Sequence, residues 1–376
     1  MSLRNSRSSD LDPTVPPGIA STSAEPAALP VSAFLAASGP VVDVRSPGEF
    51  RQGHIPGACS LPLFSDEERA EIGTLYKQEG RPSAVRHGLE LVGPRLVDLG
   101  DRLSELANAD CSGTPKVSDL RLHCWRGGMR SGSVAWLAST LDLPVVLLEG
   151  GYKAFRRWVL QSFEQPWPLR LLGGRTGCGK TDLLEAMSAR GMAVIDLEGL
   201  AHHRGSSFGG LGQPEQPSSE HFENRLALAL LHQREANAIW VEAESTQVGR
   251  CRIPRGFWQQ MVQAPVLEIQ RTEPERIERL VAVYGLQDPD GLRQATERIA
   301  RRLGPQRTDA ALKAIAVQDW ASACKAMLDY YDRCYDHELD RHPAPSLGRL
   351  DLSGLNDTDA AMRLESHLLG SEPVSA

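Results

Sequence analysis

The chain has 376 residues, 41% of them apolar and 24% charged, which allows two globular domains but no bilayer-spanning run of roughly 18 apolar residues. The net charge of -7 excludes a uniformly basic nucleic-acid-binding protein, so any contact with RNA must use local patches. The seven cysteines contain no C-x-x-C pair, which argues against a disulfide framework or structural zinc site and indicates the reducing cytoplasm.

Residues 1–28 are predicted to form a disordered tail, because they are rich in Ser, Pro, Thr and Ala and poor in large apolar side chains. The first domain is assigned to residues 29–162. Near its start, a β-branched strand ends in Asp43 and Arg45, and a Gly- and Pro-rich turn should place His54 near the edge of a sheet. These three side chains are predicted to support a site.

Cys124 lies between a short alternating strand and an apolar helix, in the run H-C-W-R-G-G-M-R-S. The two glycines let successive backbone N–H groups turn toward the thiol, and the helix that follows adds partial positive charge. Arg126 and Arg130 add two full charges. All three effects stabilise a thiolate or a bound anion, so the pKa of Cys124 should lie below the roughly 8.5 of a free thiol. We predict that these three residues are catalytic.

The run D-V-R-S-P-G-E-F-R-Q-G-H-I-P-G-A, which starts at Asp43, resembles the rhodanese domain when it is taken together with the Cys124 loop. The resemblance implies a doubly wound α/β domain whose loop cysteine carries transferable sulfur or selenium. Residues 66–106 replace the compact middle of a rhodanese domain, so we expect an insertion there that a plain sulfurtransferase lacks.

The second domain is assigned to residues 163–376, after a stiff Pro-Trp-Pro hinge, and should be a P-loop parallel sheet with a helical C-terminal part. A strand leads into G-R-T-G-C-G-K-T, which satisfies G-x-x-x-x-G-K-[ST]. Its glycines expose N–H groups to a phosphate, its lysine adds a point charge and its threonine can hold Mg²⁺. The predicted residues of this diphosphate site are Gly174, Gly177, Gly179, Lys180 and Thr181.

Acidic residues end two further strands of this domain. Asp196 could assist Thr181 at a metal, and Glu242 and Glu244 should face the same way because side chains alternate along a strand. One of these two glutamates is a candidate metal partner; the alternative is that both face solvent. Between the strands, a Gly- and Ser-rich loop that contains Arg204 has the composition of a lid or ligand clamp.

Two basic clusters are candidates for contact with RNA, and for both the alternative is a solvated charged face. The first lies beside aromatic residues at the end of the rhodanese-like half and contains Arg156 and Arg157. The second has the strongest local positive charge of the chain and contains Arg298, Arg301 and Arg302.

The ordered motifs resemble the tRNA 2-selenouridine synthase family over about residues 30–370, since D-L-E-G-L-A-H-H-R-G-S-S-F-G and E-A-E-S follow the P-loop. The resemblance implies an enzyme that replaces sulfur by selenium at C2 of a 5-substituted 2-thiouridine, at the wobble position of tRNA. Selenophosphate would be the donor, bound beside Cys124, with selenophosphate synthetase as a partner. The family also attaches a geranyl group from geranyl diphosphate to that sulfur, which implies that the P-loop holds the diphosphate.

Two other interpretations stay open from the sequence. A sulfurtransferase fused to a nucleotide-dependent kinase or NTPase could act on a small molecule, and a non-catalytic adaptor could use the rhodanese-like half to dock a partner. The presence of Cys124 favours an enzyme, because a docking module does not need the thiol. Only the arginine clusters favour tRNA over a small molecule.

Overall fold

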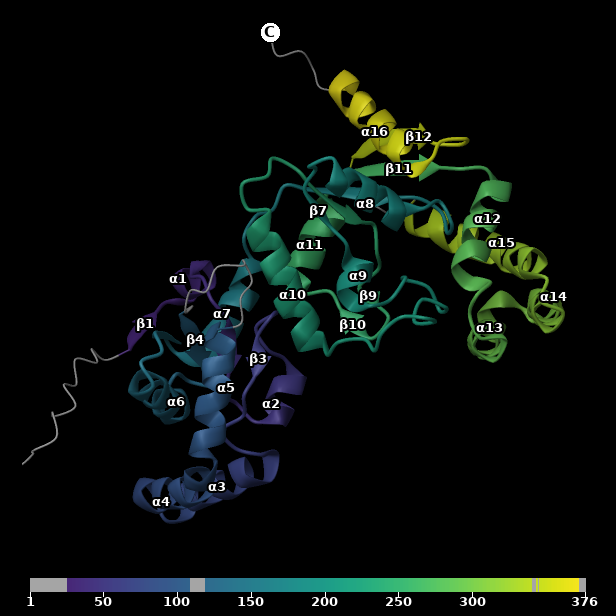
Figure 1. Ribbon diagram of the computed structural model, residues 1–376. Helices are drawn as coiled ribbons and strands as arrows, with labels where there is room; N and C mark the ends of the chain where they lie inside the picture. The colour runs from purple at the N-terminus through teal and green to yellow at the C-terminus, as the bar shows by residue number, and fades with distance from the viewer. Residues whose placement is uncertain (1–25, 109–118, 340–342, 344, 372–376) are drawn as a thin grey trace, which may run out of the picture.

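The computed structural model describes residues 26–108, 119–339, 343 and 345–371, arranged as two α/β domains (Figure 1). The predicted tail lies outside these residues except at its end, where Ala27 and Ala28 belong to the edge strand of the first sheet. The first domain ends with a helix at Ser162, and the second begins with a strand at Leu169. The predicted fold class is confirmed, because each domain is built on its own parallel sheet and the C-terminal part is largely helical.

The first sheet has the strand order β1-β5-β4-β2-β3, with every pair parallel. Its strands are β1 (Ala27–Leu29), β2 (Val41–Asp43), β3 (Cys59–Ser60), β4 (Leu120–His123) and β5 (Val145–Leu148). One face is covered by α1 (Val31–Ala36) and α7 (Gly151–Ser162) and the other by α5 (Leu96–Asn108) and α6 (Met129–Thr140). Helices on both faces bury the apolar side chains of β2 and β4 and Leu148 of β5, as expected for a doubly wound sheet.

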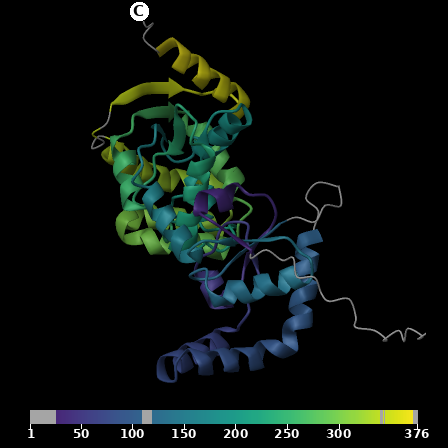
Figure 2. The ribbon, with the colours of Figure 1, turned by 90° about the vertical axis from the view of Figure 1, so that its left-hand side faces the viewer.

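The predicted insertion forms two helices that project from the first domain, α3 (Asp66–Gln78) and α4 (Arg81–Val92), at the bottom of Figure 2. The structure describes α3 in full and shows none of its residues buried. A turn of 3₁₀ helix (Gly93–Arg95) then leads into α5, whose Leu99 and Leu103 pack into the core. Only α3 and α4 are therefore an addition; α5, although within the predicted insertion, is a layer of the domain.

The second sheet is also parallel, with the strand order β12-β11-β6-β8-β7. Its strands are β6 (Leu169–Gly173), β7 (Val194–Ile195), β8 (Ile239–Glu242), β11 (Val266–Gln270) and β12 (Ser346–Asp351). One face packs against α8 (Lys180–Ala189) and α16 (Asp357–Ser371), and the other against α10 (Ser219–His232) and α11 (Arg255–Gln263). Two short elements lie beside the sheet: α9 (Leu197–Ala201) and the hairpin of β9 (Gln247–Val248) and β10 (Cys251–Arg252).

Four helices form a group of their own at one side of the second sheet (Figure 1). They are α12 (Glu273–Tyr284), α13 (Pro289–Leu303), α14 (Pro305–Ala316) and α15 (Trp320–Leu339). Leu292, Ile299 and Ile315 form the centre of their shared apolar core. Across the described part of the chain, no helix combines the length and the apolar character needed to cross a membrane.

The two domains share one hydrophobic core, because α7 of the first packs against α10 of the second. Phe155 and Val159 of α7 belong to the same buried cluster as Phe222 and Leu226 of α10. Burial of apolar surface at this contact stabilises one arrangement of the two sheets.

The polar centre of this interface is Asn224, which is fully buried. Its Nδ2 donates to the His54 carbonyl and to the Tyr152 hydroxyl oxygen, both over 2.8 Å. Arg156 donates to Asn224 Oδ1 over 2.5 Å and also pairs with Glu223. Arg156 was predicted to contact RNA. In the structure, its guanidinium instead lies at the domain interface and contacts Asn224 and Glu223.

Replacing Asn224 by alanine should lower the free energy of unfolding by about 1–3 kcal/mol, because its buried partners would each lose a hydrogen bond. Chemical denaturation of the two proteins measures the difference. Asn237→Ala, at an exposed position of the same domain, is the matched control and should change stability by less than about 0.5 kcal/mol. Wild-type stability in Asn224→Ala would mean that apolar packing alone holds the domains together.

Candidate active sites

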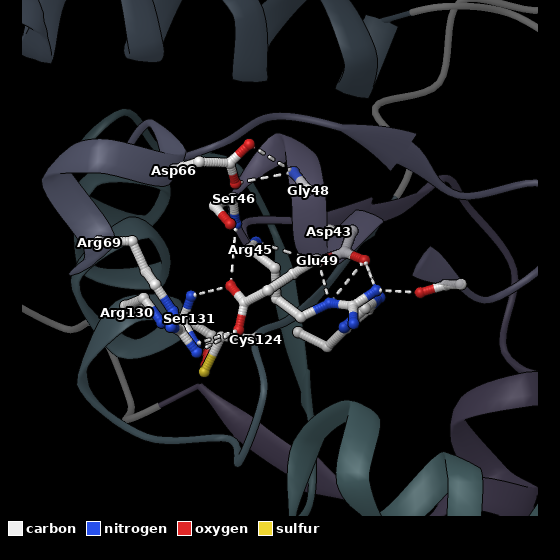
Figure 3. A network of polar contacts seen from close by, with 12 residues as sticks. Asp43, Arg45, Ser46, Gly48, Glu49, Asp66, Arg69, Cys124, Arg130 and Ser131 are labelled. Carbon is white, nitrogen blue, oxygen red and sulfur yellow. Dashed lines mark hydrogen bonds and ion pairs between the residues drawn. The ribbon is translucent and has the colours of Figure 1, made fainter. Parts of the chain in front are cut away.

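Cys124 follows β4 directly and lies at the carboxyl end of the first sheet, where open α/β sheets bind ligands. The residue is only 3% exposed. Ser131, in the first turn of α6, donates an Oγ–H hydrogen bond to Cys124 Sγ over 3.2 Å (Figure 3). The backbone N–H groups of Arg126, Gly128 and Ser131 also donate to the sulfur. The loop thus forms the nest of donors that the sequence predicts, with the Ser131 hydroxyl as a donor that sequence reasoning missed.

Burial by itself raises the pKa of the Cys124 thiol, but the hydrogen bonds from Ser131 and the loop N–H groups outweigh burial and hold the pKa below its ordinary value. The lowered pKa of Cys124 agrees with the sequence-based prediction. The main favourable cause is hydrogen bonding rather than the two arginine charges. Because the thiolate is the nucleophilic form of cysteine, these donors prepare Cys124 for attack or for holding a soft atom.

The shape of the nest depends on Gly127, whose φ of +64° lies in the left-handed region. A Cβ atom there would lie 2.8 Å from the Leu148 carbonyl oxygen, so no other residue fits without a shift. The N–H groups of Tyr152 and Lys153, at the start of α7, donate to the carbonyls of Cys124 and Trp125 over 2.8 and 2.9 Å. The loop is therefore fixed before any ligand binds.

Arg130 is held beside the nest by Glu49 of α2 (Pro47–Gln52), with Nη1 and Oε2 2.7 Å apart (Figure 3). Arg69, on the projecting helix α3, approaches the other carboxylate oxygen at 3.5 Å. Burial favours the neutral form of Glu49, but Arg130 and the Ser46 N–H outweigh it and lower the pKa. Sequence reasoning missed Glu49 as a site residue, although it is the E of the motif E-F that carried the resemblance. The Arg126 side chain is exposed.

Asp43, Arg45 and His54 were predicted to support the site, but their contacts stabilise the surrounding fold and are not with Cys124. Asp43 and Arg45 form a buried ion pair at 2.6 Å, and the Arg45 guanidinium lies 3.6 Å from the ring centroid of Tyr152. His54 stacks between Phe50 and His221, with ring centroids 3.8 and 3.9 Å away. His221 belongs to α10, so His54 contributes to the domain interface.

The P-loop connects β6 to α8, so Lys180 lies at the carboxyl end of the second sheet. Lys180 Nζ donates to the Gly174 carbonyl over 3.0 Å, and the ammonium group therefore lies across the loop. Gly177 has a φ of +84°, and a Cβ there would lie 2.8 Å from the Arg276 carbonyl oxygen. Gly174, Gly177 and Gly179 lie in the loop before α8, and Lys180 and Thr181 are the first residues of that helix, so the five together have the geometry of an anion cradle at a helix N-terminus.

The carboxylate next to the P-loop threonine is Glu198, not Asp196 as predicted. Thr181 Oγ1 donates to Glu198 Oε2 over 3.0 Å. Asp196 instead caps α9, where its Oδ1 accepts the Gly199 N–H over 2.7 Å. Glu198 lies in the D-L-E-G motif, whose spacing does not predict this contact.

Glu198 and Asp196 each interact with a second carboxyl group near the P-loop. Glu198 pairs with Glu244, and Asp196 pairs with Glu242. Burial raises the pKa of Glu198, and it raises that of the fully buried Glu242 well above its usual range, with Asp196 adding to the effect. Glu242 is thus not solvent-facing. Among the residues that the structure describes, no three His, Cys, Asp or Glu side chains are arranged to hold a metal ion.

The remaining predicted residues lie at the surface or in the lid loop. Arg204 donates to the Leu211 carbonyl over 3.2 Å and so holds its own loop together. Arg157 is exposed on α7. The other cluster lies on α13 and comprises the exposed residues Arg298, Arg301 and Arg302, of which Arg298 donates to the Ser207 carbonyl of the lid loop over 3.3 Å.

Ser131→Ala should raise the pKa of Cys124, because it removes the Oγ–H donor to the thiolate. Alkylation of Cys124 by iodoacetamide, followed by peptide mass spectrometry over a pH series, reports the thiolate fraction, and its midpoint should move to higher pH. Ser133→Ala removes an exposed hydroxyl from the same helix and should leave the midpoint in place. An unmoved midpoint in Ser131→Ala would assign the acidity to the N–H groups alone.

Known proteins match both domains. Residues 31–157 match the family model of the rhodanese-like domain, and residues 167–356 match that of the tRNA 2-selenouridine synthase AAA domain. A tRNA 2-selenouridine synthase of Bordetella bronchiseptica is 37% identical over 343 residues, which are 81% of this chain and 90% of that protein. Another, of Hydrogenovibrio crunogenus, is 36% identical over 353 residues, 84% of this chain and 92% of that protein. The chain therefore belongs to the tRNA 2-selenouridine synthase family.

Proposed function

We propose that this protein replaces the C2 sulfur of a wobble 5-substituted 2-thiouridine by selenium, with S-geranylation as an intermediate step. The observation that carries the proposal is the presence, in one chain of this family, of an acidic cysteine in an anion nest and a separate P-loop cradle. The two sites fit two anionic co-substrates, selenophosphate and geranyl diphosphate. Family membership favours tRNA over a small molecule and an enzyme over an adaptor.

The P-loop would serve the first step, in which the thiouridine sulfur attacks C1 of geranyl diphosphate. A C–S bond forms, the C–O bond to diphosphate breaks and N3 of the base loses its proton to solvent. Negative charge grows on the leaving diphosphate, and the Lys180 ammonium with the N–H groups of residues 177–181 would stabilise it.

A Mg²⁺ ion fits this cradle as a partner of the diphosphate rather than of a protein cage. The Thr181 hydroxyl and Glu198 are 3.0 Å apart, and the raised pKa of Glu198 marks a carboxyl group whose proton a cation could replace. Mg²⁺ keeps several waters and phosphate oxygens as ligands, so two protein oxygens suffice. When bound, the ion would neutralise part of the diphosphate charge.

The Cys124 nest would serve the second step. Selenium from selenophosphate forms a bond to C2, the C–S bond breaks and the geranylated sulfur leaves as a thiolate, while water takes the phosphoryl group. The N–H groups of the loop with Arg126 and Arg130 would bind the phosphate part of the donor, and the Cys124 sulfur would lie beside its selenium without forming a bond to it. Selenophosphate synthetase would supply the donor in the cytoplasm, where tRNA is found.

Cys124→Ser should stop selenation and let S-geranylated tRNA accumulate, because a serine hydroxyl stays protonated at neutral pH and cannot replace the soft, ionisable sulfur beside the selenium. Lys180→Ala should reduce geranylation first, by roughly 10²-fold or more, because it removes the charge that stabilises the leaving group. Nucleoside mass spectrometry of tRNA, with the two co-substrates supplied together and singly, measures both products.

Controls for these two variants are Cys59→Ser, at the start of strand β3, and Lys313→Ala, at an exposed site on α14, and both should keep both activities. Pre-geranylated tRNA should restore part of the selenation lost in Lys180→Ala. Equal loss of both products in a folded Cys124→Ser protein would contradict the proposed division between the sites.

Reversing Arg298, Arg301 and Arg302 to Glu should weaken tRNA binding strongly and leave geranyl diphosphate binding nearly unchanged. Phosphate contacts release counterions, so the wild-type affinity should also fall steeply with salt, and the variant should show a shallower salt slope. The same charge change at the exposed residues Arg86, Arg102 and Arg234 is the matched control. If tRNA affinity does not move, α13 presents only a solvated face.

A further inference from the structure

An apolar cavity lies directly beside the P-loop, inside the group of helices α12 to α15. It contains about 570 Å³ of space, the open solvent at its mouth included, and its lining is almost entirely apolar. All four helices contribute to the wall, among them through Leu280, Leu292, Ile315, Trp320 and Ala323. Such a cavity excludes a charged ligand and favours a hydrocarbon.

The cavity meets the phosphate cradle at its mouth. Thr176 of the P-loop lines the cavity, and a Cβ added to the adjacent Gly177 would lie 3.2 Å from Cγ of Leu280 in the wall. On the other side of the mouth, Ser206 of the lid loop approaches the Tyr284 hydroxyl at 3.5 Å. A molecule with its anionic end on the P-loop can therefore continue into the cavity without leaving the protein.

We infer that this cavity binds the hydrocarbon chain of a prenyl diphosphate whose diphosphate lies on the P-loop. This inference rests on the proposed function and assigns it a substrate site. The junction of an anion cradle and an apolar cavity matches an amphiphile with one charged end. A nucleotide fits poorly, because the polar sugar and base would lose their hydrogen bonds to water against these walls.

The cavity also explains the position of the four-helix group. The helices are linked to the P-loop through Arg276 of α12, which donates to the Thr176 carbonyl over 2.8 Å and pairs with Asp332 of α15. This buried bridge fixes the cavity mouth relative to the cradle. The walls should therefore select among prenyl diphosphates by the length of the hydrocarbon chain.

Ala323→Leu tests the assignment, because the added side chain would fill space in the cavity without touching the cradle. Calorimetric titration compares geranyl diphosphate with inorganic pyrophosphate. The wild type should bind the geranyl compound at least tenfold more tightly than pyrophosphate, and Ala323→Leu should lose most of that gain while its pyrophosphate affinity stays within twofold. Ala314→Leu adds the same group to the same helical core, away from the cavity lining, and should keep the gain.

Retained pyrophosphate binding shows that Ala323→Leu is folded at the cradle, and Trp320→Ala offers the opposite change. Enlarging the cavity should improve the affinity for farnesyl diphosphate relative to geranyl diphosphate at least threefold. The inference is overturned if geranyl diphosphate binds no better than pyrophosphate, if Ala323→Leu keeps the gain, or if ADP shows the same cavity-dependent gain. Prenyl-dependent binding without transfer to tRNA would sink the proposed function and leave the cavity assignment standing.

Discussion

The packing of α7 against α10 determines how the two candidate sites are placed. The first turn of α7 holds the Cys124 loop, because the N–H groups of Tyr152 and Lys153 donate to its carbonyls. The middle of the same helix packs into the core of the second domain. The N-terminal end of α10 in turn follows the lid loop of the P-loop site and contacts the first domain, where Ser218 Oγ donates to the Gln52 carbonyl. One helix pair therefore supports both ligand-binding edges.

Much of the fold and part of each site could be predicted, because local rules decide them. A glycine-rich turn between a strand and a helix places Cys124 and Lys180 at sheet edges whatever the rest of the chain does. The roles of Arg156 and Asp196 could not be predicted in the same way. Arg156 meets its partners Glu223 and Asn224 only when the domains are packed, since they lie more than 60 positions away.

The same limit explains why Glu49 and Glu198 were missed. Each glutamate lies within a motif of the family resemblance, but its contact is with a side chain on another element. Glu49 contacts Arg130, and Glu198 contacts Thr181. Sequence patterns report periodicity along one segment and say little about which of several carboxylates reaches a given partner. The apolar cavity could not be predicted from the sequence either. Trp320 and its neighbours have the spacing of an ordinary helical core.

Neutral N–H groups would be the main anion-binding groups of both candidate sites, because most nearby arginines are balanced by carboxylates. Arg130 pairs with Glu49, Arg276 with Asp332, and Arg279 with Asp182 and Asp357. A balanced arginine keeps its hydrogen-bonding geometry but adds little long-range field, so each cradle selects its anion by shape. The exposed arginines of α13 differ, since Arg301 and Arg302 face outward. On the proposed function, a protein with a net charge of -7 would attract an RNA backbone at this one surface, while its two candidate anion sites would stay selective.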